Sequence, residues 1–164
     1  MKALTVQQPW AWAIVHGGKD VENRTQAWSY RGPLAIHAGQ RVSERGLVSP
    51  LVRDAWDETA NYDVDECDDW ELGAIIGVVD LVGVHVAEPE IENDSGSGVW
   101  APACCESPWA EQAYDEHGGR TRRDVVHLGL ANPRPLPEPL PCKGRLGLWT
   151  PPADVLDQLQ AVIA

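Results

Sequence analysis

The chain has 164 residues, carries 25 acidic against 13 basic residues, and has a net charge of −12. This length favours one domain, and the excess of acid excludes a broadly basic nucleic-acid coat or a polybasic membrane binder. The composition is otherwise ordinary for a globular protein, except that there are eight tryptophans and no phenylalanine.

The charge is distributed unevenly along the chain. Residues 1–53 hold 7 basic and 3 acidic residues, whereas residues 54–95 hold 14 acidic residues and no lysine or arginine. Because an anion responds to the field within a Debye length of about 8–10 Å, the basic first third can still bind a small anionic ligand. The acidic stretch 54–95 is either a solvated face or a surface that binds a protein partner or imitates DNA.

The first half of the chain alternates short apolar runs with turn signals. In chain order, the predicted elements are a strand at Ala3–Val6, a helix at Pro9–His16, a strand at Leu34–Ala38 and a helix at Pro50–Thr59. Proline at the first helical position and Gly17-Gly18 after the last one favour the bounds of the first helix. Residues from Val21 onward are polar and predicted to be extended.

The second half begins with the strongest strand signal, the β-branched run Ala74–Val86. The further predictions are a short helix from Ser107-Pro108 that ends at Gly118-Gly119, a strand at Val125–Leu130, a strand ending at Gly147–Trp149 and an amphipathic final helix after Pro151-Pro152. Asn132–Pro141 holds 5 of the 13 prolines and is predicted as an extended connector. Short strands without regular βαβ alternation predict an α+β fold: a small, mostly antiparallel β-barrel with flanking and inserted helices.

The densest polar cluster follows the first predicted helix. It contains Lys19, Glu22, Asn23 and Arg24. A lysine supplies positive charge or, when desolvated, a base, and an arginine binds phosphate through its forked donors. Trp10 and Trp12 lie just upstream and could stack on a nucleobase. The alternative is a surface turn whose charges neutralise one another.

Three motifs stand together in this region: Gln8-Pro9-Trp10-Ala11, Gly18-Lys19-x-x-Glu22-x-Arg24 and Arg31-Gly32-Pro33-Leu34-x-Ile36-His37-Ala38. With Gly144–Trp149 near the end of the chain, they resemble the ASCH domain family of the PUA-like superfamily. The resemblance covers about residues 3–149. It implies a single PUA-like domain over residues 1–164, with a C-terminal helix at about 151–163, and a ligand cleft beside the barrel. The family's cleft lysine, acidic and arginine positions match Lys19, Glu22 and Arg24.

The resemblance also implies recognition of RNA, single-stranded nucleic acid or a modified nucleoside. The residues expected to bind it are Trp10, Trp12, Lys19, Glu22, Asn23, Arg24, Arg31 and His37. Some members look like enzymes, either amidohydrolases of acetylated cytidine nucleosides or ribonucleases, and such an enzyme would here use Lys19, Glu22 and Asp80. The acetylcytidine hydrolases carry a threonine three residues after the lysine, where this chain has Glu22, and a glutamate on a later strand, where Asp80 is nearest.

Asp80 and His37 each have a second interpretation. Asp80 interrupts an apolar strand and, if buried, needs a cation, hydrogen bonds or a proton. Lys19 or Arg24 would supply the charge if the strand lines the cleft; otherwise Asp80 is a strand-end or bulge residue that faces water. His37 either points into the cleft or is a satisfied core or rim residue.

The cysteines suggest free thiols. A zinc site can be drawn from Cys67, Cys104, Cys105, Cys142, His117 and His127, but zinc ligands usually come in pairs two to four residues apart, and here only adjacent cysteines occur. We therefore expect buried thiols, no metal and no cofactor. The sequence shows neither a signal peptide nor an apolar run long enough for a membrane span, so we expect a cytoplasmic protein without a membrane partner. It leaves the oligomeric state open.

Overall fold

The computed structural model describes residues 1–59, 64, 69–89, 91–92, 99–101, 104–115 and 119–163. The strands are β1 (Lys2–Gln8), β2 (Val21–Arg24), β3 (Gly32–Val42), β4 (Ala74–Val86), β5 (Ile91–Glu92), β6 (Val99–Ala101), β7 (Tyr114–Asp115), β8 (Thr121–Arg122), β9 (Val126–Pro141) and β10 (Leu148–Trp149). The helices are α1 (Trp10–Val15), α2 (Glu44–Leu47), α3 (Pro50–Asp57) and α4 (Ala153–Ile163). None of the helices in these ranges is long and apolar enough to cross a membrane.

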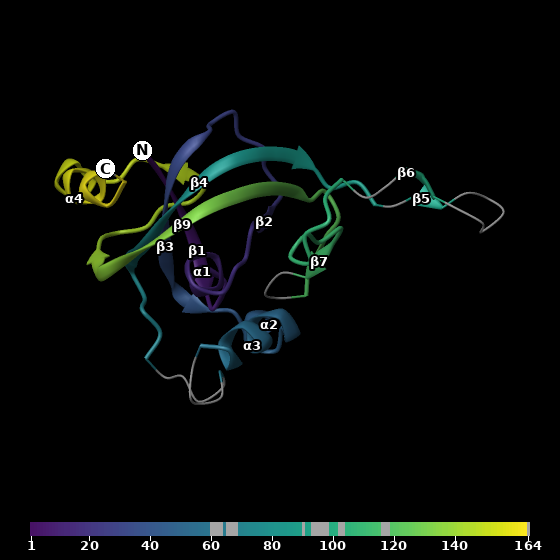
Figure 1. The fold of residues 1–164 in the computed structure, drawn as a ribbon, viewed down its shortest axis with the longest axis horizontal. Helices are drawn as coiled ribbons and strands as arrows, with labels where there is room; N and C mark the ends of the chain where they lie inside the picture. The colour runs from purple at the N-terminus through teal and green to yellow at the C-terminus, as the bar shows by residue number, and fades with distance from the viewer. Residues whose placement is uncertain are drawn as a thin grey trace.

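Six strands form one mixed sheet in the order β10-β1-β3-β4-β9-β2. Only β1 and β3 run parallel, and every other neighbouring pair is antiparallel. The sheet curls into a half-barrel around α1, while α2 and α3 lie below it and α4 lies at the left edge beside the two termini (Figure 1). The predicted α+β fold with a mostly antiparallel, barrel-like sheet is therefore confirmed.

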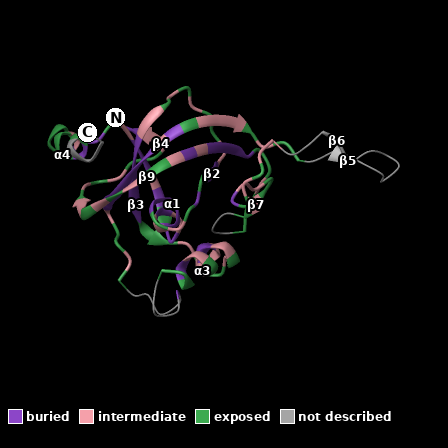
Figure 2. Ribbon diagram, in the orientation of Figure 1, coloured by how far each residue is buried: buried purple, intermediate pink, exposed green. Residues whose placement is uncertain are grey.

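The apolar core lies on both faces of the central strands. Leu34 and Ile36 of β3 pack with α1 on the concave face, whereas Ala35 between them packs with α4 on the other face. Because successive side chains of a strand point to opposite faces, β3 and β4 are covered on both sides, and this explains the continuous apolar run Ala74–Val79. Buried residues accordingly concentrate in these strands and α1, with exposed residues on the outer helices (Figure 2).

The strand Ala74–Val86 and the helix after Pro9 are found where they were predicted. The proline-rich segment differs, because β9 runs through it to Pro141 and pairs with β4 instead of serving only as a connector. Proline lacks the N–H that a strand donates. The five prolines occupy alternate positions, so the residues between them keep their N–H groups for pairing.

The helix predicted from Ser107-Pro108 is wrong. Residues 104–115 contain a single turn, in which the Ala110 backbone N–H donates to the Ser107 carbonyl at 3.1 Å, followed by the short strand β7. The predicted helix lacked an apolar stripe, and the segment is held instead by its contacts with β2. Its predicted end at Gly118, together with residues 60–63 and 65–68 of the acidic stretch, lies outside the described residues.

Candidate functional site

The predicted cluster begins where α1 ends. Gly18 has a φ of +70°, a conformation that favours glycine, and it turns the chain from α1 towards β2. The Lys19 N–H donates to the Ala13 carbonyl at 2.9 Å, which fixes the turn against the helix. Lys19, Glu22 and Asn23 are thereby brought inside the molecule, with exposures of 4%, 7% and 8%.

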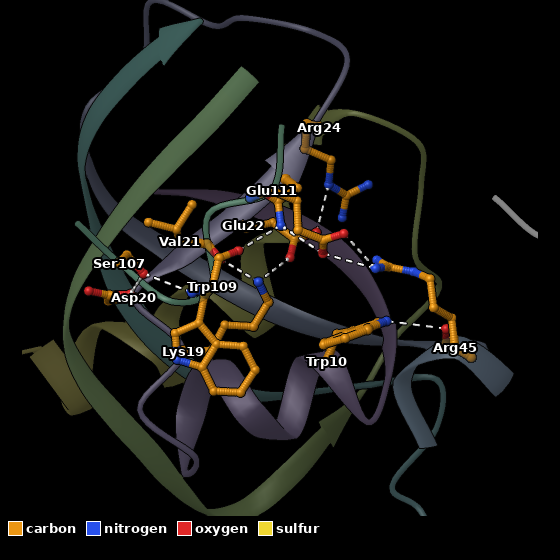
Figure 3. A network of polar contacts seen from close by, with 12 residues as sticks. Trp10, Lys19, Asp20, Val21, Glu22, Arg24, Arg45, Ser107, Trp109 and Glu111 are labelled. Atoms are coloured by element: carbon orange, nitrogen blue, oxygen red, sulfur yellow. Dashed lines mark hydrogen bonds and ion pairs between the residues drawn. The ribbon is translucent and has the colours of Figure 1, made fainter. Parts of the chain in front are cut away.

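The Lys19 ammonium is the most buried cation of the cluster. Its Nζ donates to the Val21 carbonyl and lies 3.4 Å from Oε2 of Glu22 (Figure 3). Burial lowers the pKa of Lys19, and the carboxylates of Glu22 and Glu111 oppose that shift in part. A lysine with a lowered pKa is able to exchange a proton at a lower pH than a solvated one.

Two tryptophan rings enclose this ammonium. Nζ of Lys19 lies 5.6 Å from the ring centroid of Trp10 and 5.5 Å from that of Trp109, within the range of cation–π attraction. The two rings meet edge to face, with centroids 6.5 Å apart and planes at 86°. Trp10 is also anchored to α2, since its Nε1 donates to Oγ of Ser43 at 3.2 Å.

Arg45 and Glu111 join the cluster from distant parts of the sequence. Nη1 of Arg45 lies 2.9 and 2.7 Å from the two carboxylate oxygens of Glu111, and its Cζ lies 4.8 Å from the Trp10 ring centroid. Asn23 of β2 bonds to the backbone of both residues that flank Ala110. Its Nδ2 donates to the Trp109 carbonyl at 2.9 Å, and its Oδ1 accepts from the Glu111 N–H at 3.1 Å. These bonds fix residues 109–111 against β2.

Arg24 completes the charge balance on the other side of Glu22. Its Nε lies 2.9 Å from Oε1 of Glu22, and its Nη2 donates to the Thr5 carbonyl at 2.8 Å. The side chain remains 28% exposed. Three cations thus lie among three carboxylates, since Asp20 at the edge of the network adds to Glu22 and Glu111, and the region is balanced in charge within a molecule whose total charge is −12.

An open pocket of about 380 Å³ adjoins the cluster. Its lining includes Trp10, Arg45, Trp109 and Glu111 of the cluster, together with Val48 and Leu51 at α2 and α3. This volume is within the range of about 300–1,000 Å³ that is typical of small-ligand sites. Apolar walls with a few converging polar groups suit a planar, polar-edged molecule.

Four of the sequence-predicted site residues are placed elsewhere. Trp12 packs on Trp56, with ring centroids 4.7 Å apart. Arg31 donates to the Trp28 and Tyr30 carbonyls of its own turn.

His37 is 1% exposed, packs against Trp149, and pairs through Nε2 with the Cys142 carbonyl at 2.9 Å. Asp80 pairs with Arg134 at 2.6 Å and accepts from Asn132 at 2.8 Å. Its cation is therefore Arg134, where the sequence suggested Lys19 or Arg24.

Sequence reasoning missed Arg45, Trp109 and Glu111. Arg45 and Glu111 are 66 residues apart, and Asn23 and Trp109 are 86 apart, so no local spacing relates them. The only local signal was an isolated tryptophan and glutamate after a Ser-Pro turn. Of the predicted residues, Trp10, Lys19, Glu22, Asn23 and Arg24 are brought together.

Comparison with known proteins gives the following matches. The family model of the ASCH domain matches residues 4–128. Human activating signal cointegrator 1 is 36% identical over 85 residues, which are 48% of this chain but 13% of that protein, so this chain spans only a small part of that relative.

Two solved structures are similar along nearly the whole chain. The crystal structure of ASCH from Zymomonas mobilis is 12% identical, covers 98% of this chain and 94% of its own, and gives a TM-score of 0.50. A mutant of the ASCH protein from the same organism is 13% identical, covers 98% and 96%, and gives 0.49. The first likeness concerns the fold alone and agrees with the expected PUA-like α+β architecture.

Proposed function

Because this chain belongs to the ASCH domain family, we propose that it binds single-stranded nucleic acid, RNA in the first place, by receiving one nucleotide in the pocket beside Trp10, Arg45 and Trp109. The observation that carries the proposal is the convergence of two tryptophan rings and the Arg45 guanidinium on one open pocket. Base stacking on aromatic side chains contributes about 1–3 kcal/mol per base.

Each group at the pocket has a role in this proposal. The rings of Trp10 and Trp109 offer apolar contact to a base, and the Arg45 guanidinium binds a phosphate or a base carbonyl. The Glu111 carboxylate accepts from an exocyclic amino group. Asn23 and Glu22 touch no ligand and instead hold Trp109, Lys19 and Arg24 in place.

A hydrolase acting in the same pocket is the second candidate. It is favoured by the lowered pKa of Lys19, because strongly perturbed titratable groups cluster at catalytic sites. The carboxylate near Lys19 in such an enzyme would be that of Glu111, because Asp80, the carboxylate expected from the sequence, pairs with Arg134. The Lys19 side chain is only 2% exposed, however, so a substrate would have to displace Trp10 or Trp109 to touch it. The binding function is therefore the first proposal.

The first experiment measures the affinity for a short fluorescent single-stranded RNA by anisotropy. Loss of a charge-assisted hydrogen bond costs about 1.5–3 kcal/mol, so Arg45→Gln should weaken binding by about tenfold or more. Arg145→Gln removes the same charge from an exposed position on the connection between β9 and β10, and should leave the affinity unchanged. Equal losses in both variants, or none in either, would contradict the pocket as the binding site.

The same samples distinguish the second candidate. After incubation with RNA or with acetylcytidine, a binding protein leaves both intact. Shortened RNA or released acetate, abolished in Lys19→Met, would show that the pocket is catalytic.

A further inference from the structure

A second cluster of polar side chains lies where β4 and β9 end beside residues 104–105. His85 and His127 are directly opposite each other in the β4–β9 register. Nε2 of His85 lies 3.4 Å from Nδ1 of His127. Both cysteine sulfurs, of Cys104 and Cys105, lie 3.3 Å from that same Nδ1, and the two sulfurs are 3.9 Å apart. All four potential ligand atoms lie within 4.8 Å of one another.

The hydrogen bonds around His127 determine which of its nitrogens is free. Its Nε2 lies 2.9 Å from the backbone carbonyl of Glu111, and a carbonyl can only accept. The proton of the neutral ring is therefore on Nε2, and Nδ1 presents a lone pair. Two thiols and a second imidazole all face that one lone pair, in a place where His127 is completely buried. Four nitrogen and sulfur atoms this close together, each with a lone pair to offer, form an arrangement that binds a metal cation.

We propose that His85, Cys104, Cys105 and His127 bind one Zn²⁺ in tetrahedral coordination. With Zn–S of about 2.3 Å and Zn–N of about 2.0–2.1 Å, a regular tetrahedron has edges of about 3.8 Å between two sulfurs, about 3.5 Å between sulfur and nitrogen and about 3.4 Å between two nitrogens. The observed distances of 3.9, 3.3 and 3.4 Å follow this pattern. A separation of 3.9 Å between the sulfurs is far from the bond length of a disulfide, about 2.05 Å.

The surroundings suit a metal centre. The His127 Nε2–H bond to a carbonyl is the outer-shell contact that orients metal-bound imidazoles. The Glu88 N–H donates to the Cys104 sulfur at 3.3 Å, a bond that a metal-bound thiolate also accepts. Two thiolates neutralise Zn²⁺, which leaves a neutral, closed site of the structural type.

The sequence expectation of free thiols rested on the absence of spaced ligand pairs. The structure supplies the pair in another way, because the β-ladder places His85 beside His127 although they are 42 residues apart. Cys142 lies instead next to His37, and Cys67 and His117 fall outside the described residues.

The metal would fasten residues 104–111 to the sheet. The two cysteines stand at the start of this segment, and Glu111, whose carbonyl accepts from His127, stands at its end. Trp109 of the pocket lies between them. In the described part of this segment, no helix or long strand fixes the backbone, so a bound zinc ion would hold this wall of the pocket in place. This role does not depend on what the pocket binds.

The experiment reconstitutes the reduced full chain with Zn²⁺, removes excess metal and measures zinc per chain by elemental analysis. We expect one equivalent for the wild type and for Cys142→Ser, which removes a thiol outside the cluster. Cys104→Ser, Cys105→Ser and His85→Ala should each lose metal affinity by at least about tenfold. Co²⁺ in place of Zn²⁺ should show thiolate charge-transfer bands and the intense visible bands of tetrahedral cobalt.

Each contrary outcome overturns the proposal. A wild-type chain that is reduced, folded by circular dichroism and free of zinc after reconstitution would do so. An equal loss of zinc in Cys142→Ser would show that the metal does not bind at the His85–His127 cluster. Octahedral Co²⁺ bands would exclude coordination by the two thiolates. RNA affinity is not the readout, so failure here and failure of the proposed function remain distinguishable.

Discussion

Lys19 shows how strongly a single buried charge shapes this site. Burial penalises its ammonium, and Glu22 and Glu111 offset that penalty only in part, so its pKa stays below the usual value for lysine. The sequence motif predicted that Lys19 and Glu22 act together, and their atoms lie 3.4 Å apart. It could not predict the contribution of Glu111, which comes from a segment 92 residues further along.

Asp80 provides a test at the residue scale. Hydrogen bonds from Arg134 and Asn132 hold the pKa of this carboxyl below its usual 3.8. Its carboxylate therefore stabilises the fold above pH 3.8, and that stabilisation is lost as the pH falls through the lowered pKa. Asp80→Asn should reduce the free energy of unfolding at pH 7 by about 0.5–1 kcal/mol, and the difference from the wild type should decrease as the pH falls below 3.8. Urea denaturation between pH 3 and pH 7 measures this.

The same variant decides whether Asp80 takes part in function. Because Asp80 pairs with Arg134 and not with the Lys19 cluster, we expect the RNA affinity and any hydrolysis to be unchanged in Asp80→Asn. Loss of either activity with native stability would restore Asp80 as a site residue.

At the scale of elements, the pocket is formed by short segments that hydrogen bonds and packing hold against the sheet. Helix α2 begins with Ser43 as N-cap and brings Arg45 over Trp10. The segment 104–115 brings Trp109 and Glu111 to the same place, where Asn23 of β2 bonds to the backbone of both. Displacement of any of these segments should alter the pocket without unfolding the sheet.

Gly46 is the position where this can be tested. A Cβ there would lie 2.6 Å from Cδ of Pro9 and 3.1 Å from Cε2 of Trp10, so Gly46→Ala must displace α2 or Trp10. We expect a loss of about 1–3 kcal/mol in the free energy of unfolding, as for other overpacked sites, together with weaker RNA binding.

The matched control is Gly83→Ala in β4, where an added Cβ meets no atom within 4 Å. It should retain both stability and affinity within error. If Gly46→Ala were as stable as the wild type and bound RNA equally well, the close packing of α2 on Trp10 would not matter for the pocket.

Elements that are stabilised by local sequence properties could be predicted, and elements that depend on distant contacts could not. The strand Ala74–Val86 was predicted with its bounds because a run of β-branched residues, buried on both faces over residues 74–79, is a local property. The Pro-rich part of β9 was not predicted as strand, because its pairing with β4 compensates for the missing donors only in three dimensions. The segment after Ser107 was mistaken for a helix because its stabilising bonds go to β2.

At the scale of the whole molecule, the net charge of −12 repels a polyanion, while the Arg45 guanidinium at the pocket attracts it. Repulsion from the body of the protein disfavours extended non-specific contact, whereas the partly exposed guanidinium groups of Arg24 and Arg45 attract a phosphate locally. Binding should therefore be confined to a short stretch of the ligand.

This confinement predicts a shallow salt dependence. Each phosphate neutralised on a single strand contributes about −0.7 to the slope of log affinity against log salt. With three cations at the site, of which Lys19 is buried, the slope should be no steeper than about −2, and the affinity should not increase once the RNA exceeds a few nucleotides. Anisotropy titrations at several salt concentrations and RNA lengths measure both. A much steeper slope that grows with length would indicate a larger binding surface.

The sequence by itself determined the family, the α+β class and the core of the cluster, because Trp10 to Arg24 are close in the chain and their relation is fixed by one helix, one turn and one strand. Only the tertiary structure decided the cation of Asp80, the burial of His37 and the participation of Arg45, Trp109 and Glu111. It alone also placed His85 and His127 with two cysteines. These relations depend on strand register and on the path of residues 104–115, which arise from burial across the whole sheet and leave no local pattern in the sequence.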